Sequence, residues 1–102
     1  MTKAQAIHQS ILVISEHFQI DPKALADRRT TRGVRMRAAM ASLIFHMRAC
    51  GYSYAALERF FAKGNDAIRK LESQGRLMMR GEHKAMIESL PKIPTTLVLT
   101  TI

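Results

Sequence analysis

The chain has little of the chemistry that enzymes and metal sites use. Its 102 residues include one cysteine, Cys50, and no tryptophan, and 6% are aromatic. A single cysteine excludes an intrachain disulfide and a thiolate zinc cluster. The four histidines form no HExxH pair, no GxxxxGK[ST] run is present, and Glu58 and Glu72 fit ion pairs with nearby arginines better than a catalytic pair. We therefore expect no enzyme activity, no metal and no cofactor.

Long hydrophobic runs are also missing. No stretch approaches the roughly 18 apolar residues of a membrane span. The apolar centre near the N-terminus is interrupted by Ser15, Glu16 and His17, unlike a signal peptide. With 47% hydrophobic residues, the chain is long enough for one domain with a modest core and too short for two. We expect a cytoplasmic protein with no membrane partner.

Acidic residues are fewer than basic ones, and the imbalance is concentrated in the middle of the chain. The chain has 16 Lys and Arg against 8 Asp and Glu, a net charge of +8. Between Arg28 and Arg80 there are twelve basic and three acidic residues. The densest run contains only arginines: Arg28, Arg29, Arg32, Arg35 and Arg37. Since the guanidinium fork suits phosphate, guanine and narrow minor grooves, nucleic acid is favoured as the partner over an acidic membrane surface.

Apolar residues recur at helical spacing up to about Leu90, which predicts an all-α fold, a small helical bundle. Asp21 and Ser53 are expected to cap helices, and Gly51 is expected to end one. The expected helices include Ile7–Phe18, Pro22 to about Asp27, Arg32 to about Cys50, Tyr54 to about Phe61, Asp66 to about Gln74 and Glu82 to about Leu90.

The fourth and fifth of these helices predict a helix-turn-helix, because a turn of three residues, Ala62-Lys63-Gly64, separates them. Gly64 is expected to take a positive φ, and Asn65 to cap the second helix. The plain alternative is an αα-hairpin. The expected DNA-binding residues, besides the five arginines, are Ser53, Lys63, Asn65, Asp66, Arg69 and Lys70.

Individual roles follow from side-chain chemistry at the start of the second helix. Asn65 can pair with adenine and Arg69 with guanine. Asp66 either accepts from cytosine or favours the helix N-terminus, and the second option is preferred. The side chains expected to serve phosphates are Arg48, Arg59 and Lys63. Arg76 lies just beyond the expected end of the helix and adds to the basic character of its outer face.

Three stretches resemble the C-terminal DNA-binding domain of the bacterial replication initiator DnaA: FQIDPKALADRR, RRTTRGVRMRAAMASLI and YSYAALERFF. The resemblance covers about residues 11–72. It implies that Arg28 and Arg29 enter the minor groove or contact phosphate, that Arg35 and Arg37 add further basic positions, and that the second helix reads the major groove. The family's signature Gly-Arg-Asp-His-Ser/Thr-Thr/Ser-Val is replaced here by AKGNDAI. The resemblance therefore implies a fold and a DNA-docking mode, and not a replication role. Apart from it, we expect a sequence-specific double-stranded DNA-binding protein that acts as a regulator or an accessory replication factor.

Two other interpretations stay open. The stretch AIRKLESQGRLMMRGEHKAMI also fits a winged helix, a transcriptional regulator with Leu77–Met79 and Lys84–Ile87 as wing strands. Residues 92–102 form an apolar, β-prone tail after a helical domain of residues 1–91. The tail is expected either to form a strand, which pairs within the chain or with another subunit, or to be disordered. A strand that pairs with another chain suggests a homodimer or a protein partner, and with it a small protein-interaction module. A single helix-turn-helix usually needs a dimer or an extra arm, and the arginine-rich loop is a candidate for that arm.

Overall fold

The computed structural model of the chain describes residues 1–27 and 33–95. These two ranges hold the helices α1 (Lys3–Phe18), α2 (Pro22–Ala26), α3 (Val34–Ala49), α4 (Tyr54–Phe61), α5 (Asn65–Met78) and α6 (Lys84–Glu88). They hold no strand. The predicted all-α fold, a small helical bundle, is therefore confirmed.

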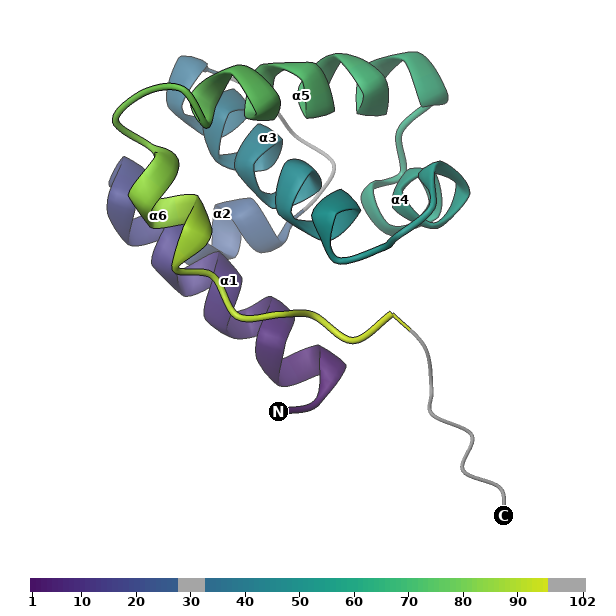
Figure 1. Cartoon of the computed structure of the whole chain (residues 1–102), viewed down its shortest axis with the longest axis horizontal. Coiled ribbons are helices and arrows are strands. Elements are labelled where there is room, and N and C mark those ends of the chain that lie inside the picture. Colours follow the sequence, from purple (N-terminus) through teal and green to yellow (C-terminus); the bar gives the residue numbers. More distant parts are fainter. Residues whose placement is uncertain (28–32, 96–102) are drawn as a thin grey trace.

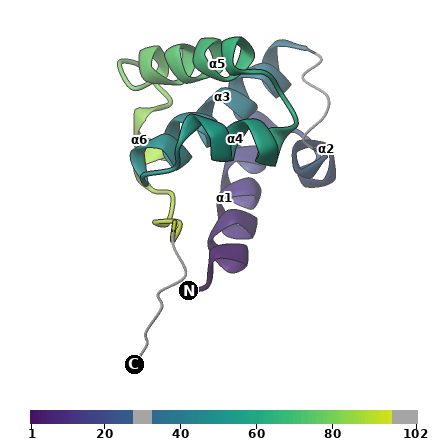
Figure 2. The ribbon, with the colours of Figure 1, turned by 90° about the vertical axis from the view of Figure 1, so that its right-hand side faces the viewer.

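The helix α3 is the centre of the fold. It packs against α1, α2 and α5, and in two perpendicular views it lies between α5 at the top and α1 at the bottom (Figure 1 and Figure 2). Its side chains from Ala39 to Ile44, together with Met47, are buried. Ile14 of α1, Leu25 of α2 and Ile68 of α5 are fully buried in the same core. A central helix with apolar residues on most of its surface explains why helical spacing alone identified it.

Side-chain caps define the starts of three helices. The Thr2 hydroxyl accepts from the Gln5 amide at 3.2 Å, and Gln5 Oε1 accepts from the Thr2 amide at 2.8 Å, a capping box that opens α1. The Asp21 carboxylate accepts from the Lys23 amide at 2.9 Å before α2. The Ser53 hydroxyl accepts from the Ala56 amide at 3.1 Å before α4. The predicted caps at Asp21 and Ser53 are confirmed.

The turn between α4 and α5 differs from the prediction. Gly64 has a φ of −73°, and the left-handed residue is Ala62, with a φ of 53°. Ala62 ends α4, where the next amide, that of Lys63, donates to the Glu58 carbonyl at 3.1 Å. The residue at the N-cap of α5 is Gly64, so the predicted cap by Asn65 is wrong. The positive φ serves to close the first helix, and that role does not require glycine.

The helix α5 continues to Met78, past the predicted end at Gln74. Gly75, within this extension, packs closely against α3. A Cβ atom at Gly75 would lie 2.6 Å from the Ala41 carbonyl oxygen and 2.6 Å from Phe45 Cβ. Glycine therefore lets the backbones of α3 and α5 approach closely, and it does not break the helix here. Leu77 and Met78 belong to α5, and Lys84–Glu88 is helical. The winged-helix alternative is wrong for these residues.

The segment 91–95 crosses the C-terminal end of α3. His46 Nε2 lies 2.7 Å from the Pro91 carbonyl oxygen, and the Tyr52 hydroxyl donates to the Pro94 carbonyl at 2.7 Å. Ile93 is fully buried, and its amide lies 3.4 Å from Cys50 Sγ. Burial lowers the pKa of His46, and its hydrogen bond to Pro91 opposes that shift. The first residues of the apolar tail therefore pack on the helical core.

Candidate nucleic-acid interface

Half of the exposed residues on α5 are basic. Ile68, Leu71 and Gly75 are buried against the core on one face of α5. Residues spaced three or four apart share a face of a helix, so a second such set on the opposite face points to solvent. These exposed side chains are Asp66, Arg69, Lys70, Ser73, Arg76 and Leu77. We call this set the outer face of α5.

Three of the six residues of the outer face were predicted as site residues: Asp66, Arg69 and Lys70. Sequence reasoning missed Ser73 and Leu77, and it placed Arg76 beyond the helix because it ended the helix at about Gln74. Leu77 is 62% exposed and adds an apolar side chain to this face. The signal that could have found it is the continued helical spacing of Leu71, Gly75 and Met78.

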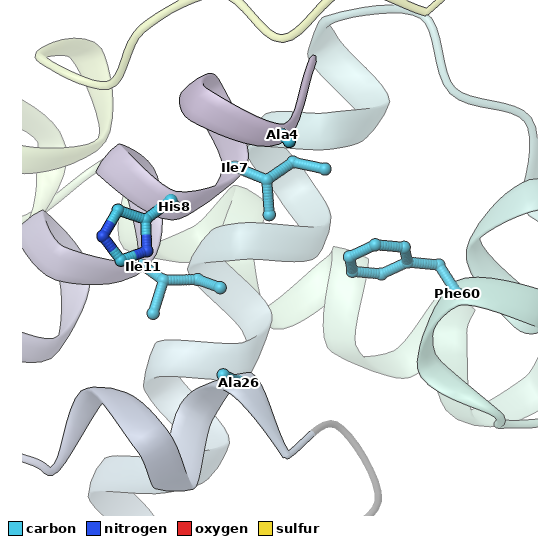
Figure 3. A pocket seen from close by; sticks show the side chains of 6 residues that line it. All are labelled: Ala4, Ile7, His8, Ile11, Ala26 and Phe60. Carbon is cyan, nitrogen blue, oxygen red and sulfur yellow. The ribbon is translucent and has the colours of Figure 1, made fainter. Parts of the chain in front are cut away.

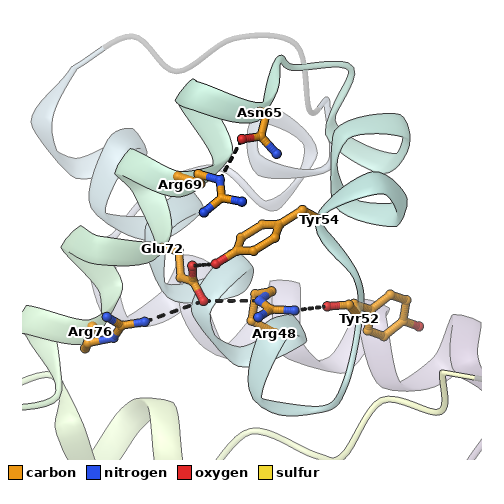
Figure 4. Close-up of polar contacts among 7 residues, drawn as sticks. All are labelled: Arg48, Tyr52, Tyr54, Asn65, Arg69, Glu72 and Arg76. Carbon is orange, nitrogen blue, oxygen red and sulfur yellow. Dashed lines mark hydrogen bonds and ion pairs between the residues drawn. The ribbon is translucent and has the colours of Figure 1, made fainter.

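Tyr54 lies between two arginines on one flank of α5 (Figure 4). The Cζ atom of Arg48 is 4.1 Å from the centre of its ring, and that of Arg69 is 4.3 Å away. Both distances are within the range of a cation–π contact. The Tyr54 hydroxyl donates to Glu72 Oε1 at 2.5 Å. Since Arg48 comes from α3, Tyr54 from α4 and Arg69 from α5, this cluster joins three helices.

Glu72 is the anion at the base of this cluster, and it is only 7% exposed. It accepts from Arg48 Nε at 3.2 Å and lies 3.8 Å from Arg76 Nη2. Burial raises the pKa of Glu72, but the hydrogen bonds from Tyr54 and Arg48 and the charges of Arg48 and Arg76 outweigh it, so the pKa lies below its ordinary value. The ion pair with arginine was predicted. The burial of the carboxylate was not.

Asn65 links Arg69 to α4. Its Oδ1 accepts from Arg69 Nε at 2.6 Å (Figure 4). Its Nδ2 donates to Glu58 Oε2 at 3.1 Å. Both ends of the amide are thus engaged within the protein. An asparagine that reads adenine needs both of those groups for the base, so this arrangement disfavours the predicted adenine contact by Asn65.

A basic cavity of about 380 Å³ lies on the other flank of α5. Its charged lining consists of Arg37 from α3, Lys63 from the turn, and Asp66 and Lys70 from α5. Arg37 reaches α5 because its Nε donates to Gln74 Oε1 at 3.1 Å. Three cations around one carboxylate leave this cavity positive, which suits an anion such as phosphate. The structure thus brings together four of the predicted site residues.

The other predicted residues are less informative. The Arg35 side chain is exposed on the first turn of α3. The Ser53 hydroxyl serves as a cap of α4. Arg28, Arg29 and Arg32 lie outside the described residues, so their predicted contacts stay predictions.

An apolar groove lies away from the outer face of α5, between α1, α2 and α4. Its volume is about 310 Å³, and it is lined by Ala4, Ile7, His8, Ile11, Ala26 and Phe60. The Phe60 ring points across the groove toward Ile7 and Ile11 (Figure 3). Apart from His8, the side chains that line the groove are apolar.

The chain matches no model of a known protein family, no curated protein and no solved structure. No helix in the described part of the chain is long and apolar enough to cross a membrane. Residues 1–27 and 33–95 also contain no group of three or more His, Cys, Asp or Glu side chains that could hold a metal ion. The features of the described residues that bear on function lie on the surface of α5 and on its two flanks.

Proposed function

We propose that the chain is a double-stranded DNA-binding protein that inserts α5 into the major groove. The outer face of α5 carries this proposal. It combines three cations with the neutral side chains of Ser73 and Leu77 on a single exposed strip. Arginine reads guanine, serine contacts several bases, and an exposed apolar side chain can pack against the methyl group of thymine. Such a mixture is more useful for reading base edges than a uniformly charged face.

The length of the strip limits the DNA site. Asp66 and Leu77 are eleven residues apart, which corresponds to about 16 Å at 1.5 Å per residue. DNA rises about 3.4 Å per base pair, so one copy of α5 covers at most about five base pairs. We expect a longer selected motif only if Arg28 and Arg29 add minor-groove contacts or if two copies bind together.

Phosphate contacts are assigned to the flanks. The cavity lined by Arg37, Lys63 and Lys70 borders the groove-facing strip, and its positive charge suits one backbone phosphate. The resemblance to DnaA adds Arg28 and Arg29 as minor-groove or phosphate contacts, and Arg32 lies in the same run of arginines. We propose that the protein acts as a regulator or an accessory replication factor. These two points depend on the sequence alone.

The experiment is selection of bound duplexes from a random-sequence pool, followed by titrations of the selected duplex and a scrambled one at several salt concentrations. We expect an enriched motif and an affinity that falls steeply with salt. Arg69→Ala should reduce binding to the selected duplex more than to the scrambled one. Lys70→Ala should weaken both equally and make the slope of log K against log salt less negative by about 0.9, the effect of one lost phosphate contact.

Lys84→Ala is the matched control, because it removes one exposed cation from α6, away from α5. It should change neither affinity nor salt slope appreciably. A steep salt dependence with no enriched motif would refute sequence reading and leave non-specific nucleic-acid binding. No binding at low salt would refute the proposed function altogether.

A further inference from the structure

Arg69 is held in one orientation more tightly than an exposed arginine usually is. Its guanidinium lies over the Tyr54 ring, with Cζ 4.3 Å from the ring centre. Its Nε donates to Asn65 Oδ1 at 2.6 Å. A long side chain that is already ordered loses less rotamer entropy when it binds, so these contacts prepare Arg69 for a ligand.

The contact to Asn65 also selects which donors Arg69 offers. With Nε engaged, the outward donors are those of the two Nη atoms, which form a fork at the end of the side chain. Guanine presents two acceptors, O6 and N7, in the major groove, whereas adenine presents one acceptor and one donor. An end-on fork therefore matches guanine in preference to adenine.

Tyr54 is itself immobilised. Arg48 stacks on its ring on the side away from Arg69 in Figure 4, and the hydroxyl donates to the buried carboxylate of Glu72. Arg48 in turn donates from Nη1 to the Tyr52 carbonyl at 2.8 Å. The ring is thus fixed from α3 and α5 together, and it provides a rigid platform for Arg69.

We propose that Tyr54 is a positioning residue that holds Arg69 end-on against a single guanine. Asn65 helps to orient Arg69 through its hydrogen bond to Nε, without touching a base. This inference rests on the proposed function, since it assumes that α5 enters the major groove. It replaces the predicted role of Asn65 as an adenine reader.

The test uses the duplex that the wild-type protein selects from a random pool. Each guanine is replaced in turn by 7-deazaguanine, which lacks the N7 acceptor. At one position the replacement should weaken wild-type binding by about tenfold, the lower part of the range for a bidentate arginine–guanine contact. In Arg69→Ala the same replacement should change binding less than twofold.

The positioning role of Tyr54 is tested by measuring how much the same 7-deazaguanine replacement weakens binding of Tyr54 variants. Tyr54→Phe keeps the ring and should keep a sensitivity of about tenfold. Tyr54→Leu removes the platform and should reduce the sensitivity to less than threefold. If Tyr54→Leu does not fold, as judged by urea unfolding, Asn65→Ala carries the same test, because it removes the partner of Nε and leaves the Tyr54–Glu72 bond in place.

The outcomes separate the inference from the proposed function. If the wild-type protein selects no motif, the proposed function fails first. If a motif is selected but Arg69→Ala weakens all duplexes equally, Arg69 contacts phosphate and the inference is overturned. A third outcome is that Arg69 reads guanine, but the folded Tyr54→Leu and Asn65→Ala variants keep the full tenfold sensitivity to 7-deazaguanine. Arg69 then needs neither residue for its orientation, and the inference is again overturned.

Discussion

Replacing Gly75 with alanine tests the packing that keeps α5 in place. In an exposed helix interior this change stabilises a protein by about 1 kcal/mol, because glycine is a poor helix former. At Gly75 the new Cβ would lie 2.6 Å from a backbone oxygen, Ala41 O, and from Phe45 Cβ. Backbone atoms cannot move aside cheaply, and overpacking of this kind costs about 1–3 kcal/mol or somewhat more. The clash exceeds the gain in helix propensity, so we expect a net loss of about 1–2 kcal/mol.

The assay is urea unfolding followed by circular dichroism, with thermal unfolding as a second measurement. A loss of that size lowers the midpoint temperature of a domain of about 100 residues by roughly 5–15 °C. Gly81→Ala is the control, since a Cβ at Gly81 would meet nothing within 4 Å. It should change the free energy of unfolding by less than about 0.5 kcal/mol. A Gly75→Ala variant as stable as the wild type would refute the close approach of α3 and α5.

Three further changes probe the same fold. Ala62→Gly should raise the free energy of unfolding by about 0.5–1 kcal/mol in urea, because Ala62 has a φ of 53° and glycine accepts that region without steric cost. Glu72→Gln should lower it by about 1–3 kcal/mol, because the buried carboxylate loses its charge opposite Arg48, whereas the amide oxygen still accepts from Tyr54. His46 has a pKa below the ordinary value of about 6.5 because it is buried, so the unfolded chain binds its proton more tightly. The stability due to neutral His46 is therefore complete above about pH 6.5 and is lost as the pH falls below it. Thermal unfolding at pH 7.5 and 5.5 should show a smaller acid-induced loss in His46→Gln than in the wild type.

The sequence was sufficient for two of the three helix starts that carry side-chain caps, and it missed the Thr2 cap of α1. Asp21 and Ser53 mark the starts of α2 and α4, and both cap as predicted. Such caps are local contacts within three residues, so their chemistry is visible in the sequence. The apolar spacing of α3 was equally informative, because a central helix buries most of its surface.

Two errors concern the ends of α5. The helix was predicted to end at about Gln74, but it continues through Gly75, which packs against Ala41 and Phe45, 30 or more positions earlier in the chain. Asn65 was predicted to cap the helix, but the N-cap is Gly64, and the Asn65 amide contacts Glu58 and Arg69. Glycine and asparagine are ambiguous in sequence because each suits both turns and close packing. Tertiary contacts decided between the two roles.

The same α3–α5 contact also determines the candidate interface. α3 contributes one cation to each flank of α5: Arg37 reaches Gln74 on one side, and Arg48 reaches Glu72 on the other. Both bonds, at 3.1 Å and 3.2 Å, cross the contact between α3 and α5 that Gly75 keeps close. A wider separation would move Arg37 from the basic cavity and Arg48 from the Tyr54 ring together. We therefore expect folded Gly75→Ala protein to lose DNA affinity and guanine discrimination at once, whereas Arg69→Ala affects mainly discrimination and Lys70→Ala only affinity.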